Sequence, residues 1–165
     1  MKVWILAIIG CLFATGAFAN TSFLQLSLTP DIALHSRTTQ INGLALNIWG
    51  ENPQNALALG IVNGASGYSS GIALGLLANY SESYTGAQLS GIVNYASGQL
   101  TGLQWSLVNY AAKLHGVQLG LVNFAAHADK GLQLGLINIM EETNQWFRNF
   151  PGEIAPVMVF VNWRF

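Results

Sequence analysis

The sequence predicts an all-β protein of about nine or ten short strands. The fold we expect is a small antiparallel outer-membrane-type β-barrel, and the alternative is a parallel β-solenoid. A unit of about fifteen residues recurs from about residue 43 to residue 140. Within each unit, apolar residues alternate with small or polar ones, which is typical of a strand. Only 8% of the residues are charged and 52% are hydrophobic, whereas soluble domains carry roughly 25% charged residues.

Residues 1–19 have the pattern of a secretory signal peptide. An apolar run follows Lys2, and Ala17-Phe18-Ala19 is a small-x-small cleavage site. Cys11 lies in a lipoprotein-like box, so its lipidation stays open. We therefore expect an exported protein in the outer membrane, or alternatively in the periplasm or at the cell surface. After cleavage, residues 20–165 would form one β-repeat domain without cysteine.

The segment before the repeats contains one further alternating strand, Phe23 to Leu28, closed by Pro30. Residues 32–40 are expected to form a connection. A hidden strand within residues 32–40, where 32–34 could be extended, would raise the strand count from nine to ten.

The repeats comprise seven imperfect copies of one strand-forming unit. In the copy 116–125, the leucines and Asn123 are expected on one face, and Gln118 and Phe124 on the other. Each copy must bury its apolar face against its neighbours. The copies begin at Gly43, Ala56, Gly71, Gly86, Gly102, Gly116 and Gly131.

Short segments between the copies, such as 66–70 and 126–130, suit tight connections between strands. An extra residue at Ser90-Gly91 indicates a β-bulge. Residues 141–155 form the longest non-repetitive loop and precede a final strand at 156–165.

The final strand carries alternating apolar residues and ends at Phe165. This ending resembles the C-terminal signature of bacterial outer-membrane β-barrels, which their assembly machinery recognises. The resemblance implies outer-membrane lipid and the barrel assembly machinery as partners.

The repeat units also resemble a known group of proteins. Units such as Gly-Leu-Gln-Leu-Gly-Leu-Ile-Asn, followed by the ending Pro-x-x-x-x-Val-Asn-Trp-x-Phe, are similar to uncharacterised bacterial surface-repeat proteins built from Gly-x-Gln-Ile-Gly-Leu-Val-Asn units. This resemblance implies an exported, envelope-associated protein and supplies no catalytic residues. Ala58 and Ala73 stand where those proteins usually have Gln.

The two candidate folds place the leucines differently. In the barrel, the Leu face would meet lipid, while Gln, Gly and Val would fill a narrow interior. In the solenoid, the Leu face would be the core, and one asparagine from each copy would join a ladder at a corner. The asparagines concerned are Asn94, Asn109, Asn123 and Asn138.

Candidate catalytic and metal-binding residues are few. Ser69 lies in a Gly-x-Ser-x-Gly pattern, but a strand follows it where a nucleophile elbow requires a helix. His35, His115 and His127 lack metal-ligand spacing. Glu141 and Glu142 are expected in a solvated loop. A further set could line a polar strip or bond inside the fold, with internal bonding favoured: Gln88, Gln104, Gln118 and Gln133.

We therefore expect a non-enzymatic cell-envelope protein of structural or surface role, without catalytic, cofactor or metal site. The alternative is an exported solenoid that binds a partner through its Gln/Tyr face. Six Lys and Arg residues and a net charge of −1 give no basis for nucleic-acid binding. The sequence does not specify a protein or glycan partner.

Overall fold

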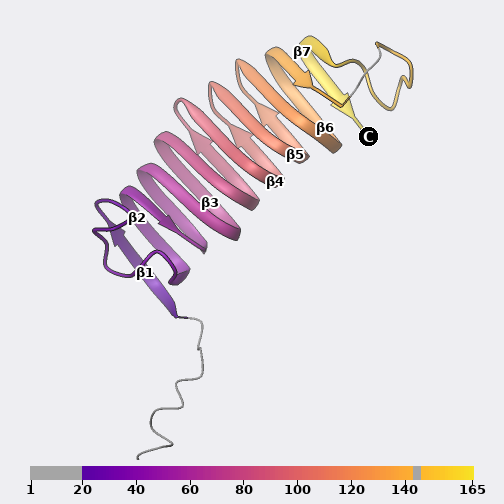
Figure 1. The fold of residues 1–165 in the computed structure, drawn as a ribbon. Coiled ribbons are helices and arrows are strands. Elements are labelled where there is room, and N and C mark those ends of the chain that lie inside the picture. The colour runs from indigo at the N-terminus through magenta and orange to yellow at the C-terminus, as the bar shows by residue number, and fades with distance from the viewer. Residues whose placement is uncertain (1–19, 143–145) are drawn as a thin grey trace, which may run out of the picture.

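The computed structural model describes residues 20–142 and 146–165. The chain winds into a stack of flattened turns that runs from the N-terminal to the C-terminal end (Figure 1). Within these residues, one sheet contains seven strands in sequence order, and consecutive strands pair with each other. The strands are β1 (Thr21–Ser27), β2 (Gln40–Asn52), β3 (Asn55–Ser90), β4 (Val93–Trp105), β5 (Val108–Leu119), β6 (Val122–Met140) and β7 (Val157–Arg164).

The pairing directions decide between the two predicted folds. Every consecutive pair from β1 to β6 is parallel, and only β6 and β7 are antiparallel. The protein is therefore a β-solenoid, so the prediction of an antiparallel barrel is wrong and the alternative is confirmed. Equivalent residues of successive copies pair directly, as Asn94 does with Asn109 and Asn109 with Asn123. In an antiparallel meander, equivalent residues would instead alternate between the two ends of the sheet.

The predicted connections are themselves strand. Residues 66–70 lie inside β3, and residues 126–130 lie inside β6. Strands β3 to β6 are separated instead in the middle of three predicted strand units, at Gly91-Ile92, Ser106-Leu107 and Gly120-Leu121, whereas the units at 56–63, 71–78 and 131–138 continue as strand. Parallel stacking explains this difference, because the connection of each turn pairs with the connection of the next. The extra residue at Ser90-Gly91 falls at one of these breaks, where β3 ends.

The break changes which side chains face inward. Gln118 and Asn123, five residues apart, are both fully buried, whereas Leu121 between them is 49% exposed. Thus the prediction that the Leu face forms the solenoid core is wrong. Asparagine, glutamine and alanine fill much of the interior, together with a few larger apolar side chains. These larger buried residues are Ile41, Tyr84, Leu100, Leu114 and Met140.

Both ends of the stack are covered by the chain itself. At the N-terminal end, the amide of Gln25 pairs with the backbone N–H and C=O of His35, both at 3.0 Å. Ala33 forms only an isolated bridge with Ser27, so residues 32–34 do not add a tenth strand. At the C-terminal end, the backbone N–H of Phe165 donates to the carbonyl of Gly152 at 2.7 Å. These segments occupy backbone groups that would otherwise offer a free sheet edge.

Candidate functional site

An asparagine ladder fixes one corner of every turn. The Nδ2 of Asn94 donates to Oδ1 of Asn109 at 3.1 Å, and Asn109 donates in the same way to Asn123 at 2.9 Å. This confirms the predicted ladder and extends it toward the N-terminus. Each donation runs toward the C-terminus. The members are Asn47, Asn63, Asn79, Asn94, Asn109, Asn123 and Asn138.

Asn47, the first member of the ladder, lies at a different backbone position from the other members. Gly50, not Asn47, pairs with Asn63 in the sheet register. A Cβ atom on Gly50 would lie 2.2 Å from the Oδ1 atom of Asn47. The glycine therefore leaves the space that the Asn47 side chain occupies.

A glutamine ladder runs beside the asparagine ladder in the opposite direction. Gln118 donates from Nε2 to Oε1 of Gln104 at 2.8 Å, toward the N-terminus, and also to the carbonyl of Phe124 at 3.1 Å. Gln133 and Gln104 repeat the pattern, and the ladder ends at Gln88. All four glutamines are buried, so internal hydrogen bonding is confirmed and they form no surface strip.

A column of glycines allows the turns to stack closely. Gly86, Gly102 and Gly116 pair in register, and their φ angles are 131°, 128° and 146°. A Cβ atom on Gly102 would lie 2.1 Å from the carbonyl oxygen of Gly86. Only glycine fits this combination of positive φ and close backbone approach. The outward side chains on either side of the column are thereby held in register.

The stacked turns present a continuous apolar face to the outside. Two columns of outward residues run through the whole stack from β1 to β7, and no position in either column is polar. The first column is Leu24, Leu44, Leu57, Ile72, Ala87, Leu103, Val117, Leu132 and Trp163. The second column is Leu26, Leu46, Leu59, Leu74, Leu89, Trp105, Leu119, Leu134 and Val161.

A third set of outward residues lies next to the second column, two residues further along the chain in each unit. These side chains are between 38% and 68% exposed and are all aliphatic. Two open grooves, of about 600 Å³ and about 430 Å³, lie between the second column and three members of this set, Leu28, Ile48 and Leu76. We call the two columns and this third set the apolar face. The third set is Leu28, Ile48, Ile61, Leu76, Leu107, Leu121 and Leu136.

The aromatic residues of the repeats form a separate exterior column. The rings of Tyr95 and Tyr110 stack with centroids 4.8 Å apart, and those of Tyr110 and Phe124 stack at 5.2 Å. Tyr80 donates its hydroxyl to Glu51 at 2.6 Å. Burial, followed by this hydrogen bond, raises the pKa of Tyr80 to about 12.

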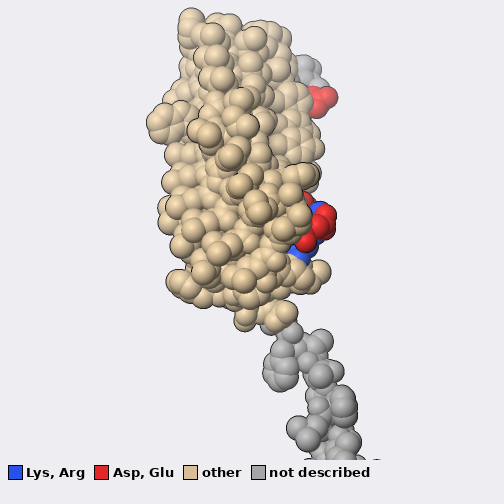
Figure 2. All heavy atoms as spheres, turned by 90° about the vertical axis from the view of Figure 1, so that its left-hand side faces the viewer, with Lys and Arg blue, Asp and Glu red and all other residues tan. Residues whose placement is uncertain are grey.

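Charged side chains gather away from the apolar face. Lys113 lies 2.9 Å from Asp129, which also contacts His127 at 3.0 Å. The hydrogen bonds from Lys113 and His127 lower the pKa of Asp129. Glu142 accepts a bond from Arg164 at 2.9 Å and also contacts His127. Seen from the N-terminal end, the visible acidic and basic atoms lie along one edge of the molecule (Figure 2).

The apolar face and the charged edge are thus the two distinctive surfaces of the solenoid. Comparison with family models, curated proteins and solved structures finds no match. These two surfaces are therefore the basis for inferring a function.

Ser69 has a structural role in this arrangement. Its Oγ atom accepts a hydrogen bond from the backbone N–H of Gln54 at 3.0 Å and donates to the carbonyl of Ser66 at 2.9 Å. The side chain is buried, and strand follows it without a helix. The bond with Gln54 ties one turn to the next, and the bond with Ser66 lies within one turn.

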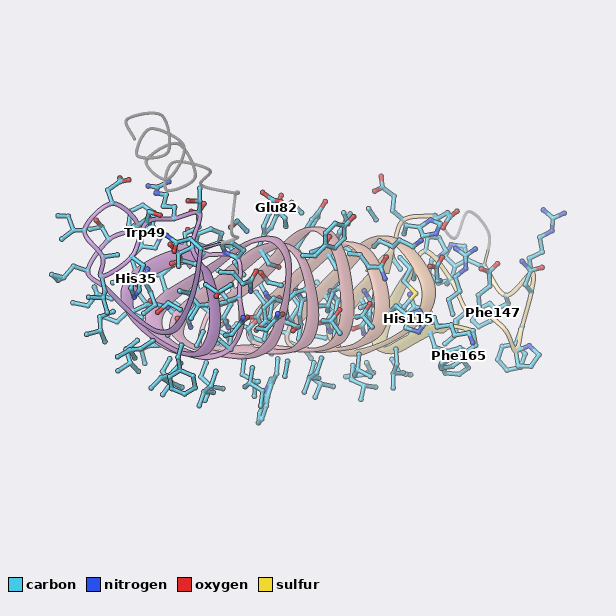
Figure 3. All side chains as sticks on the ribbon, turned by 90° about the horizontal axis from the view of Figure 1, so that it is seen from below. His35, Trp49, Glu82, His115, Phe147 and Phe165 are labelled. Carbon is cyan, nitrogen blue, oxygen red and sulfur yellow. The ribbon has the colours of Figure 1, made fainter. Side chains whose placement is uncertain are left out.

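Among the other candidate residues, His127 and Glu142 come together in the charged cluster. His35 contacts Ser22 at the N-terminal end, whereas His115 and His127 lie near the opposite end, where Figure 3 labels His115. Glu141 is exposed, and Glu142 belongs to the charged cluster. Over residues 20–142 and 146–165, no three His, Cys, Asp or Glu side chains gather as they would around a metal ion. The same residues include no helix long and apolar enough to cross a membrane.

Sequence reasoning identified the leucines of the apolar face but assigned them to lipid contact or to the core. The available signal was the asparagine that recurs in every copy and the glutamine that recurs in the last four copies. Buried amides can bond to their own copies in an in-register stack. Their burial leaves the leucines outside.

Proposed function

We propose that this chain is an exported, non-enzymatic β-solenoid of the bacterial cell envelope that binds a partner through its apolar face. The observation that carries the proposal is the continuity of this face, which runs from β1 to β7 without a polar residue in its two columns. Monomeric soluble proteins rarely expose contiguous apolar patches larger than a few hundred Å². A face of this extent is typical of a surface that is covered in the functional state.

The binding surface proposed here differs from the Gln/Tyr face expected for a solenoid. Gln104 and Gln118 are fully buried and point into the stack. The stacked rings of Tyr95, Tyr110 and Phe124 cover one another, so they offer mainly their edges to a ligand. The apolar face offers whole side chains, and it is the larger surface.

Rigidity supports a binding role. Both amide ladders are buried, and their amides bond from turn to turn; at the ladder ends, Oδ1 of Asn47 and Oε1 of Gln133 have no partner among the described residues. Hydrogen-bond networks of this kind hold a single conformation when their members are satisfied. The apolar face is therefore preorganised, and little conformational entropy is lost when a partner covers it.

Export is supported by the signal-peptide pattern of residues 1–19, which lie outside the described residues, and by the resemblance to surface-repeat proteins. The non-enzymatic assignment is supported by Ser69, whose hydroxyl is already used in two structural hydrogen bonds.

Fractionation of a Gram-negative host that expresses residues 1–165 tests this proposal. We expect the wild-type chain to be exported and to be recovered with the envelope, from which alkaline carbonate releases it. Leu74→Lys on the apolar face should weaken this association, because an unpaired charge is costly to cover with apolar surface. Tyr68→Lys is the matched control, since Tyr68 is 91% exposed and lies outside the apolar face. Retention in the cytoplasm, or identical fractionation of all three chains, would contradict the proposal.

A further inference from the structure

We propose that the partner covering the apolar face is a second copy of this chain, packed face to face as a two-fold symmetric dimer. This inference rests on the binding role proposed above and names the partner. It is argued from the spacing, the area and the charge of the apolar face.

The spacing of the face is self-complementary. Equivalent side chains recur in each turn in register, as Leu103, Val117 and Leu132 do in the first column. Paired strands lie about 4.8 Å apart, so each column forms a ladder of ridges and grooves with that spacing. A second copy has the same ladder spacing and can match it along the whole stack. Two such faces would pack about 10 Å apart, as sheets do in a sandwich core.

The area of the face fits a stable dimer. Each of the two columns contains nine residues, from Leu24 to Trp163 and from Leu26 to Val161. Nine rows at about 4.8 Å spacing, with two outward positions in every row and a third in seven of the rows, give a projected area on the order of 600 Å². Because side chains protrude from the face, its accessible surface area is larger than its projected area and approaches the roughly 800 Å² per partner of a standard interface. Homodimer interfaces are also the more apolar class.

The charge distribution favours a second copy over a lipid surface. Proteins that lie on membranes usually combine an apolar face with Lys and Arg that contact anionic headgroups. The described residues contain five basic and seven acidic side chains, and none of them belongs to the apolar face. Lys113 is paired with Asp129, and Arg164 with Glu142. This distribution leaves little positive charge to attract a membrane, and it places no like charges within the dimer contact.

Two-fold symmetry closes the assembly. In such a dimer each copy contributes the same face, so no apolar face remains free to add a third copy. The aromatic column and the charged cluster would stay on the outside of the dimer, where two copies of each contact the envelope. A monomer offers only one copy, so Leu74→Lys weakens envelope association through loss of the dimer.

Sedimentation velocity on the chain expressed as residues 1–165 and purified without detergent tests the dimer. At 1 to 100 µM protein, we expect twice the subunit mass determined by mass spectrometry. Leu119→Lys and Leu74→Lys, made separately, should each raise the dimer dissociation constant at least 100-fold, because each places an unpaired charge in an apolar contact. Tyr68→Lys should leave the dissociation constant within twofold of wild type.

A monomeric wild type at 100 µM would overturn the inference, as would a Leu119→Lys chain that dimerises normally. Flotation of monomeric wild type with neutral phosphatidylcholine vesicles would identify lipid as the occupant instead. Circular dichroism shows whether each Lys variant folds. If one variant misfolds, the dissociation constant of the other variant is the test. The mass of the wild-type chain tests the dimer independently of both variants. A monomer that still needs Leu74 for envelope association would overturn the dimer alone and leave the proposed function standing.

Discussion

Asn109 donates from Nδ2 to Oδ1 of Asn123 across 2.9 Å, and neither side chain has any exposure to solvent. Asn123 in turn donates to Asn138 at 2.8 Å and to the carbonyl of Leu134 at 3.0 Å. Each asparagine thus joins its own turn to the next one. The corner of the solenoid depends on a chain of hydrogen bonds that has no access to water.

Replacement of Asn123 by Leu should therefore destabilise the fold strongly. The substitution leaves an N–H of Asn109 and the Oδ1 of Asn138 without their partners in the interior. Each buried unsatisfied group costs roughly 1–3 kcal/mol, so the expected loss is about 2–6 kcal/mol. Urea unfolding followed by circular dichroism measures it. Asn42→Leu is the control, because the side chain of Asn42 is exposed; equal losses in the two variants would show that the ladder contributes nothing specific.

The sequence predicts the class of fold and the ladder, but not the direction of the strands. Alternation with period two is the same in a parallel and an antiparallel sheet. Small residues such as Gly120 suit a barrel interior as well as a solenoid corner. The inward direction of Gln118 and Asn123 depends on the corner between them, which the alternation pattern does not reveal. The paired positions of Asn109 and Asn123 become informative only once parallel stacking is assumed.

The sequence predicts that leucines form one face of the strands, but it does not predict that this face is exposed on the outside of the solenoid. Leucines such as Leu119 and Leu134 alternate along the strands, but a solvent-facing apolar surface on a monomer is unfavourable. Sequence reasoning therefore assigned them either to lipid or to the core. The structure places them outside because the buried amides already occupy the interior.

Substitution of Gly102 by Ala should destabilise the stack. At φ 128°, an L-residue is strained, and its Cβ would lie 2.1 Å from the carbonyl oxygen of Gly86. Backbone strain of this kind costs about 1–3 kcal/mol, and the steric clash adds to it. Thermal unfolding should show the loss as a lower Tm. Gly67→Ala is the matched control, because Gly67 also has a positive φ, 59°, but nothing lies within 4 Å of its added Cβ. A smaller shift for Gly102→Ala than for Gly67→Ala would refute the proposed close contact.

The aromatic column should contribute to stability through Tyr110, whose ring stacks on two neighbours. Tyr95 lies 4.8 Å away on one side and Phe124 lies 5.2 Å away on the other. Each stacked pair is worth about 0.5–1.5 kcal/mol beyond area burial, so Tyr110→Ala should lower the free energy of unfolding by about 1–3 kcal/mol or more. Tyr68→Ala should change it by less than about 0.5 kcal/mol, as expected for an isolated surface position. Equal effects in chemical denaturation would argue against a stabilising stack.

Alkaline pH should destabilise the solenoid through Tyr80 and Tyr84. Burial raises the pKa of Tyr84 above its ordinary value, and burial together with the bond to Glu51 raises the pKa of Tyr80 to about 12. A raised pKa means that the folded state favours the neutral phenol. This contribution is complete below the ordinary pKa of about 10 and is lost as the pH rises through the folded-state value. We therefore expect the Tm to fall between about pH 10 and pH 12, together with the appearance of tyrosinate absorbance.

Tyr84→Phe isolates the contribution of one of these groups. The hydroxyl of Tyr84 is buried and has no hydrogen-bond partner among the described residues, so its removal sacrifices no bond. At pH 8 the variant should be at least as stable as wild type, because an unsatisfied buried polar group has been removed. At pH 12 it should retain more of its stability, because a phenylalanine side chain cannot ionise. Thermal unfolding by circular dichroism from pH 8 to pH 12 measures both effects, with Tyr68→Phe as the exposed control. If Tyr84→Phe and wild type lose stability in parallel over this range, ionisation of Tyr84 is not a cause of alkaline unfolding.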